Sequence, residues 1–354
     1  MNEEMKKPDE NFDNQEVLPE EKTDDSVSQG EKKSKKGKLI TGLVTVCVIG
    51  IAIAVLIICL AAQGNLKYVL NADGQSYSVY ISEYDFDTWN NEKDVVIPEE
   101  YKNLPVTRIN SNGFSLSDTL VSVTIPESVT VIGGEAFSNC GSLEKLSIPD
   151  TIIEIEAGIT GGAFDNSPKL QFNEYSNALY LGNDDNPYVV LVKAKDKEIT
   201  SCEIHKDTKV IAPDAFRDCT LLKGIFIPGD VRTICSSAFR GCTSLLEVSG
   251  CAGLIKIGTA AFSGCESLLN VMLATNLLTG SESKLTHIES VAFGDCKSLS
   301  GIVIPKSVVY IGSQAFNHCD SLTDVFYTGT EEEWAKIEIS DSNTSLTDAT
   351  IHFN

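Results

Sequence analysis

Apolar residues recur in a short phrase that repeats along residues 95–326. Each phrase is anchored on a phenylalanine, with a leucine six residues after it and an isoleucine five residues before it. The anchors are Phe114, Phe137, Phe164, Phe216, Phe239, Phe262, Phe293 and Phe316, and the isoleucines are Ile109, Ile132, Ile159, Ile211, Ile234, Ile257, Ile288 and Ile311. Their spacings of 23, 27, 52, 23, 23, 31 and 23 define a 23-residue unit with three insertions. This periodicity predicts a solenoid of stacked coils, each filling the same slots.

A β-strand is predicted after the leucine of each unit. Apolar residues stand nine and eleven positions after the phenylalanine, as in Val123 and Ile125, and this alternation places one strand face inward. A proline such as Pro126 often follows and ends the strand, because it cannot donate to a ladder. A second apolar pair, such as Val308 and Ile311, then leads back to the next Ala-Phe. Each coil is therefore expected to be β-rich.

Cysteine occupies one slot of the phrase, three residues after the phenylalanine, in six units; Ser117 and Ser167 occupy it in the other two. These repeat cysteines are Cys140, Cys219, Cys242, Cys265, Cys296 and Cys319. A small, mildly polar side chain suits a tight buried position, which predicts a structural column of free thiols. Two alternatives stay open: disulfides, including a bridge among Cys202, Cys235 and Cys251, and a metal site, for which a spacing of 23 is unsuited.

The motifs L-x-x-[VIL]-x-[IL]-P, V-x-x-I-G and A-F-x-x-C, in this order, resemble the BspA-like leucine-rich repeat of surface proteins in bacteria and some protists. Residues 66–81 resemble that family's N-terminal β segment, and residues 327–337 resemble the segment that closes its repeat arrays. The resemblance implies a β-rich leucine-rich-repeat solenoid over 95–326, an N-terminal β cap over 63–94 and a C-terminal cap over 327–354. It also implies adhesion or contact with other cells.

The N-terminal 62 residues differ in composition from the repeats. Residues 1–38 are polar and predicted to be disordered, and they end in a run of five lysines. Residues 39–62 carry no charge over 24 positions, which as a helix would span about 36 Å and cross a hydrocarbon core of about 30 Å. The lysines before this segment predict an uncleaved signal anchor with a cytosolic N-terminus and an extracellular C-terminal domain. A cleaved signal peptide is disfavoured by the length and position of the segment.

The 52-residue spacing holds an insertion near 173–203. Two alternating segments, 178–181 and 188–193, flank the sequence Gly-Asn-Asp-Asp-Asn-Pro and predict a β-hairpin. Such a hairpin either packs on the solenoid as a structural element or projects as a recognition element, because loops on rigid scaffolds often bind. The candidate recognition residues are Asn183, Asp184, Asp185, Asn186 and Tyr188.

The net charge and the absence of catalytic motifs argue against two classes of function, nucleic-acid binding and catalysis. The net charge of −22 lacks the basic footprint of a nucleic-acid binder. The four histidines stand in no catalytic motif and no cofactor-binding motif is present, so we expect neither an enzyme nor a cofactor. We predict a membrane-anchored surface protein that binds an extracellular protein or glycan. The alternative is an envelope scaffold or sensor that couples the external domain to the tail of residues 1–38.

Overall fold

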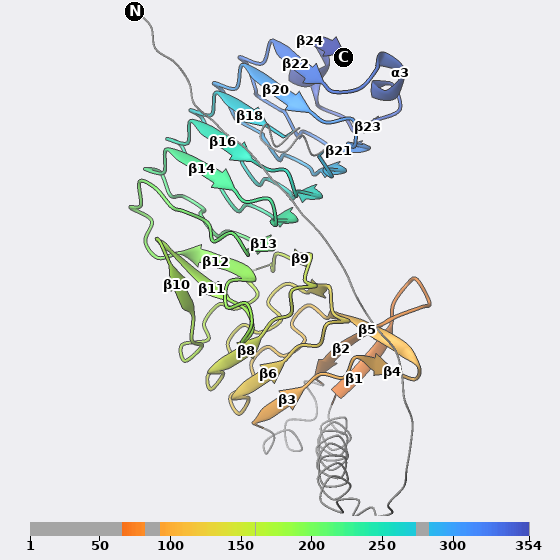
Figure 1. Cartoon of the computed structure of the whole chain (residues 1–354), viewed down its shortest axis with the longest axis vertical. Coiled ribbons are helices and arrows are strands. Elements are labelled where there is room, and N and C mark those ends of the chain that lie inside the picture. Colours follow the sequence, from red (N-terminus) through yellow and green to blue (C-terminus); the bar gives the residue numbers. More distant parts are fainter. Residues whose placement is uncertain (1–65, 82–92, 160, 274–282, 354) are drawn as a thin grey trace, which may run out of the picture. The chain divides into compact units, whose positions relative to one another are not determined.

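The structure, a computed structural model, describes residues 66–81, 93–159, 161–273 and 283–353 (Figure 1). All of these residues belong to one compact unit of the chain, Ala54–Asn354. The predicted disordered tail and the predicted membrane anchor lie outside the described residues. Within the described ranges, no helix combines the length and the apolar character needed to cross a membrane.

The repeats form stacked coils, and each coil contributes a longer strand and a shorter strand to two separate rows of parallel pairs (Figure 1). The longer strands form two sheets. The first contains β3 (Asp94–Val96), β6 (Ser122–Thr124) and β8 (Lys145–Ser147). The second, called here the C-terminal long-strand sheet, contains β14 (Gly224–Ile227), β16 (Glu247–Gly250), β18 (Asn270–Met272), β20 (Gly301–Ile304), β22 (Asp324–Tyr327) and β24 (Thr350–Phe353).

The second row consists mainly of two-residue strands, with longer strands in the N-terminal segment and in the insertion, and it is also interrupted once. One sheet contains β1 (Leu66–Leu70), β2 (Tyr77–Ile81), β4 (Glu100–Tyr101), β5 (Leu104–Ile109), β7 (Val131–Ile132) and β9 (Glu154–Ile155). The other runs through β10 (Asn173–Tyr175), β11 (Ala178–Leu181), β12 (Val190–Ala194), β13 (Val210–Ile211), β15 (Thr233–Ile234), β17 (Lys256–Ile257), β19 (His287–Ile288), β21 (Tyr310–Ile311) and β23 (Glu338–Ile339). The predicted β-rich leucine-rich-repeat architecture is thereby confirmed for the described residues.

The eight anchor phenylalanines are all buried, and most of their rings stack between coils. One stack joins Phe114, Phe137 and Phe164, with ring centroids 5.3 and 6.4 Å apart. The second stack runs from Phe216 to Phe316, with centroids 4.9 to 5.3 Å apart. Offset or parallel aromatic pairs add to the free energy gained from burial, so the phenylalanine slot couples each coil to the next.

The isoleucine slot of the third coil differs from the prediction. Ile159 is fully exposed, and Ile155 on β9 is 1% exposed and pairs in register with Ile132. The four extra residues of this unit therefore fall after the short strand, between Ile155 and Phe164, and not before it. The prediction that Ile159 fills the inward slot is wrong, because the 23-residue period is kept from Ile132 to Ile155.

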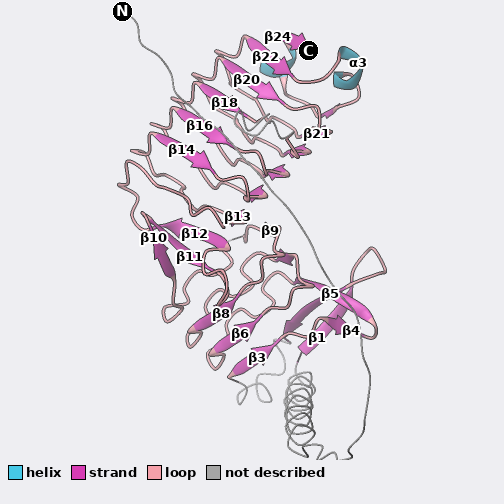
Figure 2. Ribbon diagram, viewed as in Figure 1, coloured by secondary structure: helices cyan, strands magenta, loops and turns pink. Residues whose placement is uncertain are grey.

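The inserted block forms the predicted hairpin and builds it into the solenoid (Figure 2). β11 and β12 pair antiparallel, β10 adds a further antiparallel strand, and β12 then pairs parallel with β13. Tyr180 and Leu191 are fully buried, so the hairpin contributes to the core. In the second row of strands, β12 of the insertion thus occupies the position before β13 that the short strand of a coil would otherwise fill.

A polar seam joins the third coil to coils that follow the insertion. The Arg232 guanidinium donates to the carbonyl oxygens of Asp150 and Ile152, at 2.6 and 3.3 Å. The Lys256 ammonium lies 2.8 Å from the Glu154 carboxylate. Beside them Cys235 is buried against the same part of the core as Ile155. These contacts span 80 to 102 residues, whereas neighbouring coils are separated by about 23.

Each end of the described repeats carries additional structure. At the start, β1 and β2 pair antiparallel, as expected for the N-terminal β segment. At the end, β23 and β24 extend both rows of strands by one coil, and two short helices lie within that coil, α3 (Glu331–Trp334) and α4 (Thr344–Thr347). The α3 helix begins with a capping box between Thr330 and Glu333.

Candidate binding face

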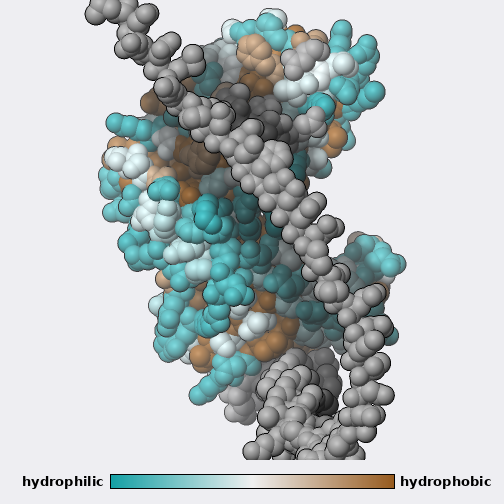
Figure 3. All heavy atoms as spheres, viewed as in Figure 1, coloured by the Kyte–Doolittle hydropathy of each residue, from teal (hydrophilic) through white to brown (hydrophobic). Residues whose placement is uncertain are grey.

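The outward side of the C-terminal long-strand sheet carries a row of apolar residues. Because alternate residues of a strand face opposite sides, the residues between the buried positions line up across the sheet. The pairing register aligns Phe226, Ser249, Met272, Val303, Phe326 and His352. Phe226, Met272 and Phe326 are 62%, 44% and 46% exposed. Figure 3 shows hydrophobic side chains gathered over these strands.

The same row in the N-terminal half of the solenoid has a different character. There, the register aligns Val96, Thr124 and Ser147, which are small or polar. Both sheets pair the strands of successive coils in parallel and bury apolar inward residues, so the coil geometry does not require large apolar groups at these outward positions. The exposed apolar row is therefore a property of the C-terminal sheet alone, and large exposed apolar surfaces on soluble domains commonly mark interaction sites.

A groove of about 330 Å³ lies across strands β16 to β22 on this outward side. Its lining includes Glu247, Asn270, Met272, Gly301 and Phe326. Gly301, which pairs in register with Asn270 and Asp324 beside the apolar row, leaves open space because it has no side chain, and a Cβ built there would lie 3.8 Å from Phe326 Cε2. The groove is mainly apolar, with a carboxylate and an amide among its lining groups.

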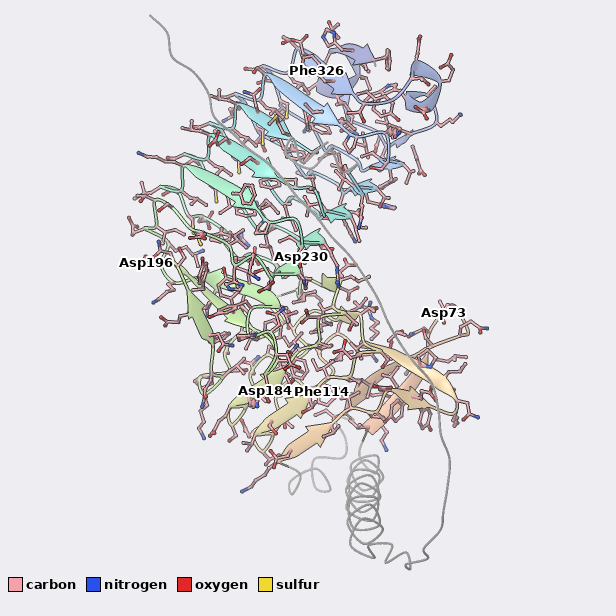
Figure 4. All side chains as sticks on the ribbon, viewed as in Figure 1. Asp73, Phe114, Asp184, Asp196, Asp230 and Phe326 are labelled. Carbon is pink, nitrogen blue, oxygen red and sulfur yellow. The ribbon has the colours of Figure 1, made fainter. Side chains whose placement is uncertain are left out.

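Phe326, which lines the groove, is held by its neighbours on β22 and β24 (Figure 4). Its ring stacks on His352 with centroids 4.7 Å apart and an angle of 14° between the planes. His352 Nε2 lies 2.7 Å from Asp324 Oδ1. The hydrogen bond from His352 lowers the pKa of the Asp324 carboxyl. The Asp324–His352 pair therefore fixes one face of the Phe326 ring.

Most of the five candidate recognition residues in the hairpin make internal contacts. The Asn183 amide donates to the Ile148 carbonyl at 2.9 Å, and the Asn186 amide donates to the Asp150 carboxylate at 3.1 and 3.2 Å. The Tyr188 ring stacks on His205 with centroids 3.9 Å apart.

The other two residues of the predicted recognition set, Asp184 and Asp185, are exposed. Asp184 lies 3.0 Å from the Lys145 ammonium, a solvent-exposed ion pair of little energetic weight (Figure 4). Recognition by the hairpin stays a prediction, and within the described residues these two aspartates are the members of the set whose side chains face solvent.

The repeat cysteines lie in the core, where five of the six thiols donate a hydrogen bond to the preceding coil. All nine described cysteines are free and buried. The thiols of Cys140, Cys242, Cys265, Cys296 and Cys319 each donate to the carbonyl oxygen of the phenylalanine in the coil before, at 3.1 to 3.3 Å. Ser167 donates to the Phe137 carbonyl in the same way at 2.8 Å. Serine and cysteine are thus interchangeable donors in this slot.

Burial makes these thiols weaker acids than an exposed cysteine. Desolvation raises the pKa of Cys140 to about 11 and the pKa values of Cys242 and Cys319 to about 12. A thiolate is the reactive form of cysteine, so a thiol with such a pKa is unsuited to nucleophilic or redox chemistry at neutral pH. The column is structural, and the outward groove is the feature available to a ligand.

The sequence and structure of the chain resemble those of known leucine-rich-repeat proteins. The model for the BspA type leucine-rich repeat region matches residues 75–183, 194–283 and 279–352, in six copies. A leucine-rich cell surface protein of Faecalibacterium prausnitzii is 21% identical, with 78% of this chain and 96% of that chain covered and a TM-score of 0.44. A leucine-rich repeat protein of Bacteroides ovatus is 22% identical (82% and 70% covered, TM-score 0.32), and the pneumococcal vaccine antigen PcpA is 16% identical (82% and 98% covered, TM-score 0.39). No curated protein matches the chain.

Proposed function

This chain belongs to the BspA-type leucine-rich-repeat family, and we propose that it is a cell-surface binding protein that recognises a protein or glycan through its C-terminal long-strand sheet. The exposed apolar row of that sheet carries the proposal, because the fold does not require it. An adhesion or recognition role uses a broad surface assembled by repetition, in which a few apolar anchors supply most of the binding free energy.

The cellular location is part of the same proposal. The uncharged segment 39–62 would hold the chain in a membrane, with the lysine-rich tail on the cytosolic side and the repeats outside. Intact cells that express the full chain can be treated with protease and then probed with one antibody to residues 64–354 and a second to residues 1–38. Loss of the first signal with retention of the second is the expected result. Protection of the repeats from protease would place them behind a barrier and contradict a surface role.

The binding face is tested with substitutions on the two outward rows. Cells that display the full chain are applied to arrays of purified extracellular proteins and glycans. Replacing Phe226 and Phe326 with serine is expected to weaken binding to the identified ligand by at least tenfold, since each removes an exposed apolar anchor. The matched substitutions Val96→Ser and Thr124→Ser on the N-terminal half should leave binding unchanged. Equal binding by both double variants would refute the assignment of the face.

A further inference from the structure

The outward side of the C-terminal long-strand sheet presents two neighbouring rows of residues at the groove. One row contains Met272 and Phe326, and the other contains Glu247, Asn270 and Gly301. The two rows lie two residues apart along each strand, or about 7 Å at roughly 3.3 Å per residue. An α-helix with its side chains is about 10–12 Å wide, so one helix laid across the strands covers both rows.

The spacing along the groove also suits a helix. Successive strands of a sheet lie about 4.8 Å apart, and the apolar groups of Met272, Val303 and Phe326 repeat at that interval from β18 to β22. One turn of an α-helix rises about 5.4 Å. The apolar positions of a helix placed across the strands therefore meet successive coils over nearly three turns, because the three inter-strand steps from β16 to β22 span about 14 Å.

The negative charge of the groove favours a helix that carries a basic residue. Glu247 lines the groove, and its carboxylate has no ion-pair or hydrogen-bond partner among the described side chains. Two other carboxylates of the same coils are already engaged: Asp324 with His352 and Glu266 with the Lys297 ammonium, the latter at 2.6 Å. A ligand that covers the groove would desolvate the Glu247 carboxylate, which is costly unless a cation accompanies it. Charge complementarity therefore calls for a basic group beside an apolar stripe.

We propose that this groove binds an amphipathic α-helix of a partner protein, whose apolar stripe packs on Met272, Val303 and Phe326 and whose lysine or arginine pairs with Glu247. The inference rests on the proposed binding function and names the class of ligand. A neutral sugar would bring hydroxyl donors to the Glu247 carboxylate but neither a compensating charge nor an apolar stripe that covers Met272, Val303 and Phe326 together. Helix-in-groove recognition through residues one turn apart is a common mode of peptide binding.

The groove contains a spectroscopic reporter. The chain has three methionines, Met1, Met5 and Met272, and Met272 lines the groove. The full chain in detergent micelles is labelled with methyl-¹³C methionine, and Met272→Leu assigns the groove resonance. The probes are a 15-residue helical peptide of leucine and lysine, the same peptide with glutamate for lysine, and a maltohexaose. Titrations at 150 mM salt are followed at Met272, while the Met1 and Met5 methyls report non-specific binding to the acidic chain.

Two substitutions and their controls test the contacts. Glu247→Gln is expected to weaken binding of the lysine peptide about tenfold, as for loss of a hydrogen bond to a charged group. Glu266→Gln removes an equal charge from a carboxylate outside the groove and should leave the affinity within about twofold. Gly301→Ala and Gly301→Val fill the groove stepwise, and the nearest atom to a Cβ at that position is 3.7 Å away, so both variants should fold. Affinity should fall slightly with alanine and at least tenfold with valine.

The outcomes separate this inference from the proposed function. A Met272 shift with the lysine peptide that is weakened by Glu247→Gln and Gly301→Val supports a basic helix. An equal response to the glutamate peptide, a response to maltohexaose alone, or equal effects of the two glutamate substitutions overturns it. If these tests are negative while Phe226 and Phe326 remain necessary for binding on the arrays, the helix inference falls and the binding face stands. If both are negative, both fall.

Discussion

The thiol column makes the stability of the solenoid sensitive to alkaline pH. Cys242 and Cys319 are buried and donate to phenylalanine carbonyls, and desolvation raises the pKa of each from 9.0 to about 12. The neutral thiol is therefore preferred in the folded chain. Its contribution to stability is fully present below pH 9.0 and is lost progressively as the pH rises from 9.0 toward 12, because only the unfolded chain releases the proton in that range.

The size of the stability loss follows from the pH range between the unfolded and the folded pKa of the thiol. At pH 10, one unit above the unfolded pKa, each thiol that ionises only on unfolding lowers the free energy of unfolding by about 1.4 kcal/mol. The double substitution of Cys242 and Cys319 with serine removes two such groups and keeps a hydroxyl donor, as Ser167 already does. Between pH 8 and pH 10 the variant should therefore lose about 3 kcal/mol less than the unaltered chain.

The assay is urea unfolding of the full chain, followed by far-ultraviolet circular dichroism under reducing conditions without oxygen. A matched variant acts in the opposite direction: Ser167→Cys adds one buried thiol and should increase the loss at pH 10 by about 1.4 kcal/mol. Parallel pH dependences for the unaltered chain, the serine variant and Ser167→Cys would refute the reasoning, because the buried thiols would then not govern the alkaline transition.

Three further predictions concern the core and the chain's modification. Phe262→Ala should lower the free energy of unfolding by about 4 kcal/mol and cost more than Phe164→Ala, because Phe262 stacks on two rings and Phe164 on one; urea midpoints measure the difference. Gly133→Ala should destabilise strongly and Gly301→Ala little, because a Cβ at Gly133 would lie 2.3 Å from a backbone nitrogen; thermal unfolding of both checks this. Asn343, within a glycosylation sequon, is 4% exposed with its amide hydrogen-bonded, so expression of the folded chain in a eukaryotic secretory pathway should leave it unmodified by mass spectrometry.

The inward residues of the coils were predictable because packing fixes them. Each Phe and Leu slot faces the same space in every coil, so identity repeats at 23 residues and is visible in one sequence. Ile159 was misassigned because counting back from Phe164 placed the extra residues before the isoleucine. The signal in the sequence was the 23-residue spacing from Ile132 to Ile155, and the pairing of these two residues in the structure agrees with it. Sequence spacing shows that residues were inserted, whereas their position within the coil depends on which residues pair.

The outward residues could not be predicted to the same extent. Phe226, Met272 and Phe326 occupy variable positions of the repeat, and their alignment across β14, β18 and β22 depends on strand register through units of different length. The groove also depends on Gly301, which leaves space beside Phe326. No sequence motif marks this glycine, because its role depends on the residues of the neighbouring strands. For the hairpin, the antiparallel strands were predicted from local alternation, but the parallel pairing of β12 with β13 is a long-range contact without a local signal.

The polar seam has a consequence for how the chain folds. Coils that touch only their neighbours bring together residues about 23 apart, and such local contacts allow a solenoid to grow from any point. Arg232 and Lys256 instead contact residues 80 to 102 positions earlier. During synthesis from the N-terminus, the third coil reaches its final packing only after the chain has passed Lys256. The first half of the solenoid must therefore persist with an uncovered edge for that interval, when it is most exposed to aggregation.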